Sequence, residues 1–536
     1  MQYARRGLVS RYGEPRSADG TAQQLVVLAM GKLGGGELNF SSDVDLVLLF
    51  PEHGDTDGAR SIANEEFFMR LAQAIIRLLG APTFDGFVLR VDLRLRPFGD
   101  SGPLVASFAS FEDYLPRHGR EWERYAYVKA RAVTALDSYA EIYASAVRPF
   151  VYRRYLDYGV FESLREMKAL IEREVERREL ADHVKLGPGG IREVEFIVQA
   201  FQIIRGGQDR RLQTQSLLSA LELLDTWKRL PSGMTDELRA AYTYLRRLEN
   251  RLQMIGDAQV HSLPEDALTR ERIALAMGVS DWLALVAELN RHRELVSRHF
   301  RLVVCGVAEQ DPNAVRIDLG RFWDTQAETA VLAESLARAG FAASDEAARL
   351  LLEMRSSSLV RKLDEPGRKR LQALLPTLLA DVARMGNKDP EAHGPPGALA
   401  ATAGGTSAKP LDPEAQLQVL RRVLRVIDAI GQRSTYFALL HENAAARARL
   451  VDLCGHGDFL TQQIASHPLL LDELIDERLA ELPSRASLEG EVRSRLEQLS
   501  DDEPERQVEA LRLFQRAAIF RVAVADLTGR IPVMRV

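Results

Sequence analysis

The chain has 536 residues, of which 70 are Lys or Arg and 76 are Asp or Glu, and its formal net charge is −6. With 46% apolar and 27% charged residues, the composition excludes a mainly disordered chain, and the mildly acidic balance argues against a dedicated nucleic-acid binder. There are only two cysteines, no signal peptide, and no charge-free apolar run of the ~18–20 residues that cross a bilayer, so we expect a large soluble protein of the reducing cytosol.

The first quarter of the chain alternates between strand-like and helix-like patterns. Val- and Leu-rich runs bounded by Gly or Pro predict strands at 25–30, 43–50 and 87–96. Residues 61–80 have helical periodicity, with Phe67, Leu71 and Ile75 on one stripe. Strand, helix and strand in this order predict an α/β domain in which a helix crosses a mixed sheet.

From about residue 110 onward the patterns are helical, so we expect a helix-rich protein. Helices are predicted at 161–180, 191–205, 213–231, 235–258, 268–278, 281–305, 324–340, 344–354 and 367–385. Residues 388–413 are rich in Gly, Pro and Ala, which is typical of a flexible linker. These patterns divide the chain into a lead-in, an α/β domain, a helical domain, the linker and a second helical domain, with bounds at 1–19, 20–135, 136–387, 388–413 and 414–536.

Two carboxylates follow a glycine cluster in the stretch GKLGGGELNFSSDVDL, which begins at Gly31. Because successive side chains of a strand point to opposite faces, Asp43 and Asp45 are expected to project together. Neighbouring carboxylates repel each other unless a cation lies between them. A divalent metal is the usual cation, and Mg²⁺ favours a few carboxylates together with substrate phosphates.

The third predicted strand extends this pattern. Its alternation predicts that Arg90, Asp92, Arg94 and Arg96 share one face. Asp92 is then available as a third metal ligand, and arginines suit phosphate oxygens, which they bind bidentately. Metals held by three carboxylates can stabilise both the attacking and the leaving oxygen of an in-line displacement at phosphorus.

Each feature also has an ordinary structural explanation when it is taken alone. A pair of aspartates on a strand can be a solvated edge, an Arg–Asp face can be a surface lattice of salt bridges, and a glycine cluster can be a turn. Together and in order, however, the strand, glycine loop, Ser-Ser-Asp-x-Asp, helix and Asp-bearing strand resemble the nucleotidyltransferase superfamily related to polymerase β. The resemblance implies a polymerase β-like catalytic domain at 20–135.

Four blocks narrow the resemblance to one family. They are AMGKLGGGELNFSSDVDLVLLF, RVDLRLRPFGDSGPLV, REWERYAYVKARAV and GPGGIREVEFIVQAFQIIRGG, which lie in order within residues 29–207. They closely resemble the bifunctional glutamine synthetase adenylyltransferase/adenylyl-removing enzymes. In that family an N-terminal centre removes AMP from a tyrosine of glutamine synthetase by phosphorolysis, yielding ADP, and a C-terminal centre adds AMP from ATP. The GGGELNFSSDVD form and the single cassette imply a fragment that carries the adenylyl-removing centre and lacks the second catalytic domain.

The resemblance also implies residues and partners. Asp43, Asp45 and Asp92 carry over as catalytic, Mg²⁺-binding carboxylates. The implied phosphate- or nucleotide-binding residues are Gly34, Gly35, Ser41, Ser42, Arg94, Arg96, Lys129 and Arg131. Of these, Lys129 and Arg131 are placed on one helix, where they either reach the phosphates or form structural ion pairs. The implied partners are glutamine synthetase, inorganic phosphate, ADP and ATP, with PII signal protein and glutamine as candidate effectors, and no nucleic acid or membrane.

We expect the protein to act in the cytoplasm. Two other functions are alternatives to adenylyl removal. The first is the forward reaction, ATP-dependent adenylylation of glutamine synthetase. The second is a non-catalytic helical scaffold that binds PII protein and glutamine, although an intact set of three aspartates argues against an inactive domain.

Overall fold

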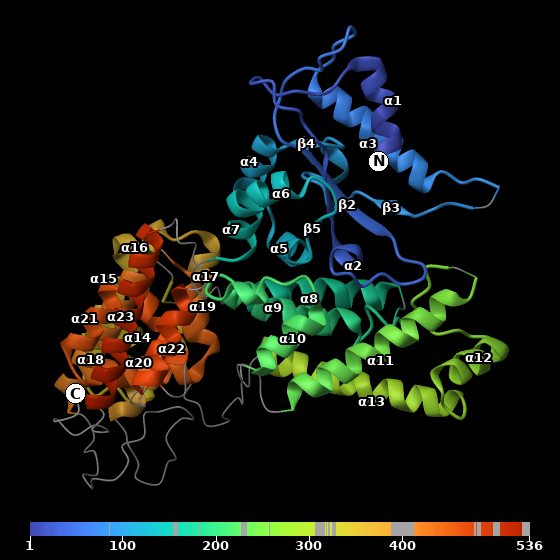
Figure 1. Ribbon diagram of the computed structural model, residues 1–536. Helices are drawn as coiled ribbons and strands as arrows, with labels where there is room; N and C mark the ends of the chain where they lie inside the picture. Colours follow the sequence, from blue (N-terminus) through green and yellow to red (C-terminus); the bar gives the residue numbers. More distant parts are fainter. Residues whose placement is uncertain are drawn as a thin grey trace. The chain divides into compact units, whose positions relative to one another are not determined.

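The computed structural model divides into two compact units (Figure 1). The first contains residues 1–156 and 160–305, and the second contains residues 157–159 and 306–536. The structure describes residues 1–84, 86–153, 159–178, 180, 182–226, 233–256, 258–305, 317, 319, 322–323, 329–386, 412–431, 433–475, 479, 484–496 and 504–527. The predicted linker at 388–413 therefore lies outside the described residues except for its last two positions, and the predicted domain bounds stay a prediction.

The described strands of the first unit form one five-stranded mixed sheet. They are β1 (Val26–Ala29), β2 (Val44–Phe50), β3 (Val91–Asp92), β4 (Ala106–Ser107) and β5 (Arg131–Ala132). Strand β2 lies between β1, which is antiparallel to it, and β3, which is parallel to it, while β5 pairs with the far edge of β1. β4 also pairs with β2, at its C-terminal end.

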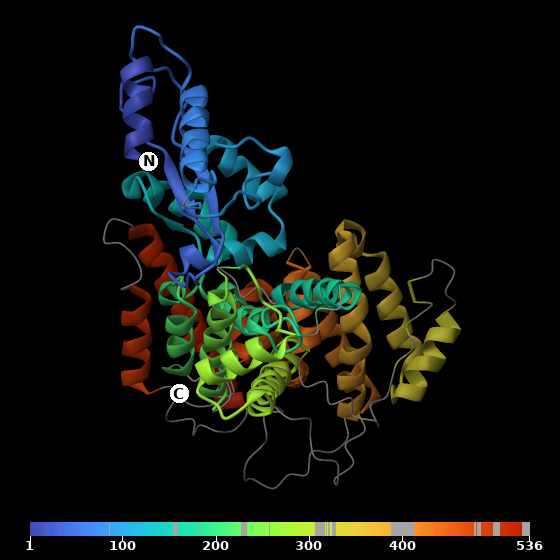
Figure 2. The same cartoon turned by 90° about the vertical axis from the view of Figure 1, so that its right-hand side faces the viewer.

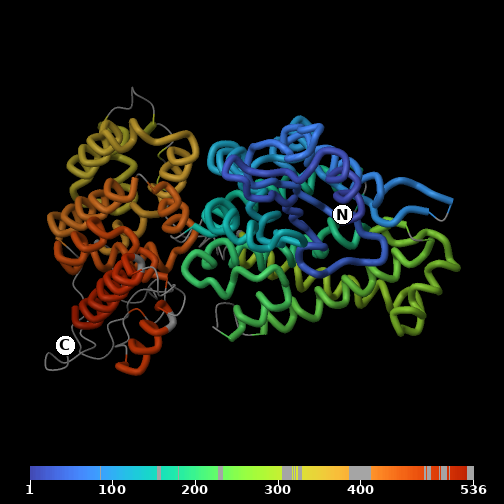
Figure 3. The backbone as a smooth tube through the Cα atoms, turned by 45° about the horizontal axis from the view of Figure 1, so that its top comes forward, coloured from blue at the N-terminus to red at the C-terminus, as the bar shows by residue number. Residues whose placement is uncertain are grey.

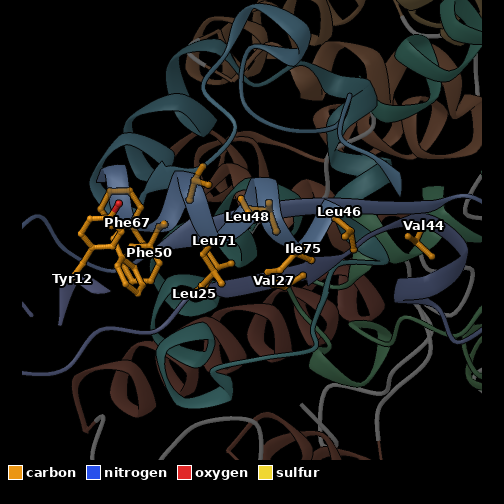
Figure 4. Packing of buried hydrophobic residues seen from close by; sticks show 13 residues of the cluster. Tyr12, Leu25, Val27, Val44, Leu46, Leu48, Phe50, Phe67, Leu71 and Ile75 are labelled. Atoms are coloured by element: carbon orange, nitrogen blue, oxygen red, sulfur yellow. The ribbon is translucent and has the colours of Figure 1, made fainter. Parts of the chain in front are cut away.

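The alternation of β2 separates a core face from a polar face. Val44, Leu46, Leu48 and Phe50 are buried against helix α3 (Asn64–Gly80), as Figure 4 shows. The core is continued by the predicted stripe of Phe67, Leu71 and Ile75 and by helix α1 (Gln2–Tyr12). Asp45, on the opposite face of β2, therefore points away from this core.

The remaining elements of the first unit are helical. They are α2 (Gly31–Gly34), η1 (Gly99–Ser101), α4 (Phe108–His118), α5 (Glu121–Val128), α6 (Leu136–Ile142), η2 (Tyr143–Val147), α7 (Arg148–Val151), α8 (Gly159–Arg177), α9 (Ile191–Arg205), η3 (Arg210–Leu212), α10 (Leu217–Thr226), α11 (Met234–Met254), α12 (Ala267–Met277), α13 (Trp282–Phe300) and η4 (Arg301–Cys305). Figures 1 and 2 show that α2, at one end of the sheet, faces the layer formed by α8 to α11. This end of the sheet holds the predicted site.

The described secondary-structure elements of the second unit are all helices. Its elements are α14 (Thr329–Ala339), α15 (Ser344–Ser356), α16 (Ser358–Lys362), α17 (Glu365–Gly386), α18 (Pro413–Ile430), α19 (Thr435–Glu442), α20 (Ala444–Gly455), α21 (Asp458–Ser466), η5 (Pro468–Ile475), α22 (Arg485–Leu496) and α23 (Pro504–Leu527). The buried stripe of α18 packs against α17, α20 and α21 (Figure 3, yellow to red).

The helix-rich organisation with a small mixed sheet is confirmed, but two local predictions are wrong. The strand predicted at 87–96 contains only Val91 and Asp92, because the chain turns directly afterwards and Arg96 donates its backbone N–H to the Leu93 carbonyl. Arg94 and Arg96 therefore do not continue the face of Asp92. The helix predicted to carry Lys129 and Arg131 ends at Val128, because Arg131 pairs with β1 as part of β5.

No single helix among the described residues is long and apolar enough to cross a membrane. Helix α12 and the segment Trp282–Val304 are together long and apolar enough to cross a membrane. They are, however, separated by a bend of 63°.

The turn at α2 gives a test of the fold. A Cβ atom on Gly34 would lie 1.9 Å from the Lys129 carbonyl oxygen and 2.6 Å from that of Ala29. Gly34→Ala should therefore lower the free energy of unfolding by about 3 kcal/mol or more, because neither backbone segment can move without disturbing the sheet. Urea denaturation measures the change.

The matched control for this variant is Gly7→Ala, on α1, where a Cβ atom would meet nothing within 4 Å. This change should be neutral or stabilise the protein by about 0.5–1 kcal/mol, because alanine loses less backbone entropy in a helix. Equal effects of the two substitutions would contradict the tight packing of Gly34.

Candidate active site

The predicted aspartates come together at the start of β2. Asp45 on β2 is paired in register with Asp92 on β3, and Asp43 lies just before β2. The backbone fixes this arrangement, because Met30 donates its N–H to the Asp45 carbonyl at 2.9 Å and Val44 donates to the Arg90 carbonyl at 2.8 Å. The carboxylate of Asp45 lies over Gly31, where a Cβ atom would be 2.6 Å from Oδ2.

Two of the three carboxylates have protein donors. Arg90 Nε donates to Asp43 Oδ1 at 3.1 Å, and Gln259 Nε2 donates to Asp43 Oδ2 at 2.9 Å. Arg94 donates to Asp92 from its backbone N–H and from Nε, each at 2.8 Å. Asp43 and Asp92 are thus each held by an arginine.

Burial raises the pKa of Asp45 above its ordinary value, and the nearby carboxylates of Asp92 and Asp43 raise it further. By contrast, hydrogen bonds from Arg94 lower the pKa of Asp92. The negative charge of Asp45 is therefore poorly compensated, which is the electrostatic situation that a bound cation relieves.

The carboxylates suit a divalent cation in their chemistry and placement, since Mg²⁺ prefers oxygen ligands. However, no group of three acidic, His or Cys side chains in the described part of the chain is arranged to hold a metal ion. Because Arg90 and Gln259 hold Asp43 and Arg94 holds Asp92, a metal would have to replace some of these contacts.

The glycine turn is internally hydrogen-bonded. Gly34 donates its N–H to the Met30 carbonyl and Gly35 donates to the Gly31 carbonyl, at 3.0 and 3.1 Å. Arg131 donates to the carbonyls of Gly34 and Leu33, at 3.0 and 2.9 Å. In this conformation the two glycine N–H groups and the Arg131 guanidinium stabilise the turn, and their predicted binding of phosphate remains a prediction.

Lys129 forms the structural ion pairs that were the alternative to phosphate binding. Its ammonium is buried and donates to Glu37 Oε2 at 2.9 Å and to Glu195 Oε1 on α9 at 3.0 Å. Burial alone lowers the pKa of Lys129, but the charges of Glu195 and Glu37 outweigh it and raise the pKa. Glu37 also accepts a hydrogen bond from Tyr242 of α11 at 3.0 Å, so Glu37 and Lys129 together tie the glycine loop to α9 and α11.

A second buried carboxylate, Glu249 of α11, ties down the same loop. Lys32 Nζ lies 2.9 Å from its Oε1, and Asn39 Nδ2 donates to its Oε2 at 2.5 Å. Arg246 is a further ion-pair partner, and His261 Nδ1 lies 2.9 Å from Oε1. Burial would raise the pKa of Glu249, but His261, Lys32 and Arg246 hold it far below its ordinary value.

The remaining predicted residues have structural partners. Buried Ser41 donates its N–H to Gln253 at 3.3 Å, and Ser42 Oγ accepts a hydrogen bond from the Asn39 N–H at 3.1 Å. Arg96 donates to the Leu93 carbonyl at 2.9 Å and lies 3.4 Å from Asp100. Arg94, whose side chain is 74% exposed, is the phosphate-binding candidate that can most readily reorient toward a ligand.

Sequence reasoning missed the acceptors that hold the loop. Glu37 and Glu195 lie within two of the blocks that characterise the sequence, and Glu249 lies on α11. The available signal was a carboxylate among apolar helix positions, as at Glu195 between Val194 and Phe196. Lys129, which pairs with Glu37 and Glu195, and Lys32, which pairs with Glu249, lie far from these carboxylates in the sequence, so these pairs could not be read from spacing.

Two family models match the chain. The model described as glutamate-ammonia ligase adenylyltransferase matches residues 1–146 and 447–536. The model described as GlnD PII-uridylyltransferase matches residues 165–304. The first match includes all three aspartates of the candidate site, and the second includes Glu195 and Glu249.

Curated relatives match nearly the whole chain. The chain is 44% identical to the bifunctional glutamine synthetase adenylyltransferase/adenylyl-removing enzyme of Thioalkalivibrio sulfidiphilus, over 99% of the chain and 52% of the relative. It is 42% identical to the enzymes of the same name from Shewanella frigidimarina and Pseudomonas aeruginosa, over 99% and 100% of the chain and 53% and 52% of the relatives. The chain thus spans about half the length of the curated relatives it matches.

The pair of Lys129 and Glu195 predicts a pH-dependent stability. Burial raises the pKa of Glu195, but Lys129 and then Arg192 lower it to about 2, below the ordinary 4.5. The stabilisation is therefore complete above about pH 5 and is lost as the pH falls from about 4.5 to about 2. Glu195→Gln should destabilise the protein by roughly 3 kcal/mol at pH 7, and the difference from the wild type should shrink over that acidic range.

Chemical denaturation of both proteins at several pH values measures this difference. Glu288→Gln is the control, because Glu288 is partly exposed and pairs with the exposed Arg291, so its loss should change stability by less than about 0.5 kcal/mol. A Glu195→Gln variant that loses stability in parallel with the wild type down to pH 3 would contradict the ion pair.

Proposed function

Because the chain belongs to the family of the bifunctional glutamine synthetase adenylyltransferase/adenylyl-removing enzymes, we propose that its first unit is a polymerase β-like nucleotidyltransferase that removes AMP from the adenylylated tyrosine of glutamine synthetase. The observation that carries this proposal is the register pairing of Asp45 with Asp92, beside Asp43, on the polar face of the sheet. It is the chemical arrangement that phosphoryl transfer needs: clustered carboxylates next to arginines, with the charge of Asp45 poorly compensated.

The proposed reaction is phosphorolysis. An oxygen of inorganic phosphate attacks the α-phosphorus, the bond from phosphorus to the tyrosyl oxygen breaks, and the products are ADP and tyrosine, whose oxygen takes up a proton. No protein base is needed, because phosphate is already an anion at pH 7. A divalent metal such as Mg²⁺, held by Asp43, Asp45 and Asp92, would supply charge stabilisation for the transferred group.

The arginines around the aspartates hold the carboxylates in place, and one of them can also bind phosphate oxygens. Arg94 holds Asp92 in place, and its exposed guanidinium is free to move to a phosphate oxygen once a cation neutralises Asp92. Arg90 holds Asp43 and also donates to Ser41 Oγ, so it orients the segment that leads into β2. Arg96 has less freedom, because backbone carbonyls and Asp100 already engage it.

ATP-dependent adenylylation of glutamine synthetase is the second candidate, because the names of the relatives include both activities. Nucleotidyl transfer in either direction would use the same carboxylates. Incubation of the chain with adenylylated glutamine synthetase, Mg²⁺ and phosphate, scored for ADP, tests the first reaction. Unmodified glutamine synthetase with labelled ATP, scored for bound AMP, tests the second.

The match of residues 165–304 to the PII-uridylyltransferase model supports a regulatory role for the helices of the first unit. We include PII signal protein and glutamine among the proposed effectors for this reason. Neither ligand is needed for the proposed chemistry at the aspartates.

The variant Asp45→Asn tests whether Asp45 is needed for catalysis without being needed for stability. The variant should lower the rate of ADP release by at least about 100-fold, because it removes charge from the proposed metal site. It should not lower the melting temperature, and should raise it if anything, because the carboxylate is half-buried beside two others. Enzyme kinetics and thermal denaturation of the same preparation measure both effects.

Asp113→Asn is the control, since Asp113 is a 68% exposed residue of α4 that pairs with Arg117. It should change neither rate nor stability. Near-normal turnover by the folded Asp45→Asn variant would refute the assignment of the site.

A further inference from the structure

The basic side chains around the aspartates are almost all engaged by the protein itself. Lys32 and Lys129 bind buried carboxylates, Arg90 and Arg94 bind the aspartates, and Arg131 binds backbone carbonyls. These cations are therefore largely neutralised in the conformation described. A phosphoryl group that enters this site would bind most readily to a cation that the protein leaves unpaired.

Lys185 is different from these residues. It lies in the loop that precedes α9, on the first unit, and its side chain is part-buried. Within the part of the chain that the structure describes, its ammonium forms no ion pair or hydrogen bond. An unpaired ammonium in a partly desolvated position is unfavourable, which indicates a charge held ready for a ligand.

The carboxylates that act on Lys185 include one aspartate of the candidate site. Burial lowers the pKa of Lys185, the positive charge of Arg192 lowers it further, and the carboxylates of Glu195, Glu249 and Asp45 act in the opposite direction. Glu195 and Glu249 are already bound by Lys129 and Lys32. Asp45 is thus the nearby carboxylate whose charge is not balanced by a protein ion pair, and Lys185 in turn offsets part of the rise in the pKa of Asp45.

The backbone of the loop is fixed, so the lysine is presented from a rigid base. The Lys185 carbonyl accepts the Arg192 N–H at 3.1 Å, and Ile191 donates to the Val184 carbonyl at 3.1 Å. Val184 in turn donates to the carbonyl of His261, on the segment that supplies Gln259 to Asp43. The loop and the aspartates therefore share one hydrogen-bonded framework.

We propose that Lys185 is a substrate-binding residue that contacts a phosphoryl oxygen at the edge formed by Asp45 and Asp92. The ligand is a phosphate group, either the attacking inorganic phosphate or the α-phosphoryl group of the adenylylated tyrosine. The assignment to these two groups rests on the proposed function, whereas the binding of a phosphate anion by Lys185 does not.

The test is equilibrium binding to the full chain by calorimetry, with Mg²⁺ present, in two separate titrations with inorganic phosphate and AMP. Lys185→Gln should weaken at least one of them tenfold or more, and Lys185→Arg should recover part of the loss. Loss in the phosphate titration alone assigns Lys185 to the attacking group, and loss in the AMP titration alone assigns it to the transferred group. Loss in both titrations supports the proposal as a contact shared by the two groups.

A matched control and a stability measurement separate binding from a structural role. Lys168→Gln removes one charge from α8 in the same unit, where Lys168 pairs with Glu193, and it should leave both affinities within twofold. Lys185→Gln should not lower the melting temperature, because no ion pair is lost. Unchanged affinities in folded Lys185→Gln, or a wild type that binds neither anion, would overturn the proposal.

ADP release from adenylylated glutamine synthetase, measured on the same wild-type protein, tests the proposed function independently. If binding depends on Lys185 but no ADP forms, the anion site stands and the proposed reaction fails. If ADP forms in Lys185→Gln with an unaltered rate and an unaltered dependence on both phosphate and adenylylated glutamine synthetase, the reaction stands and the role of Lys185 fails.

Discussion

Glu37, Glu195 and Glu249 bring negative charge into the region where the glycine loop meets α9 and α11, and each of them has to be matched by a cation. Lys129 serves the first two, and Lys32 and Arg246 serve the third. Ion pairs of this kind contribute little net stability compared with apolar packing, but breaking one leaves an uncompensated buried charge. The position of the loop before β2, and with it the position of Asp43 and Asp45, depends on keeping every pair intact.

This constraint explains why several basic residues near the aspartates are engaged by protein groups. Lys129 and Arg131 lie in a block that closely resembles an enzyme family, yet their partners are Glu37, Glu195 and two carbonyl groups of the glycine turn. Their positive charges stabilise the buried carboxylates and the glycine turn beside the aspartates. In the described part of the chain, the basic groups most available to a substrate are Arg94, whose side chain is exposed, and Lys185, whose ammonium has no ion-pair partner.

The sequence predicted those parts of the molecule that local periodicity controls. The stripe of Phe67, Leu71 and Ile75 and the alternation of β2 gave the core and the face of Asp45, because both periods are properties of the backbone itself. The strand around Asp92 was predicted too long, since alternation persists in the sequence after the chain has turned at Leu93. The role of Glu249 could not be predicted, because only Arg246 is close to it in the sequence, whereas Lys32 and His261 are brought to it by the tertiary fold.

The long separation in sequence between the glycine loop and Glu249 also has a consequence for biosynthesis. Lys32 and Glu249 are separated by 217 residues, and Asn39 and Glu249 by 210. During translation the sheet and its core leave the ribosome long before α11 does, so the loop that carries the aspartates is first exposed without its buried counter-charges. Domains generally begin to fold as they emerge, from the N-terminus onward. We therefore expect the nascent chain to form its hydrophobic core while the loop before β2 still lacks Glu249, its partner on α11.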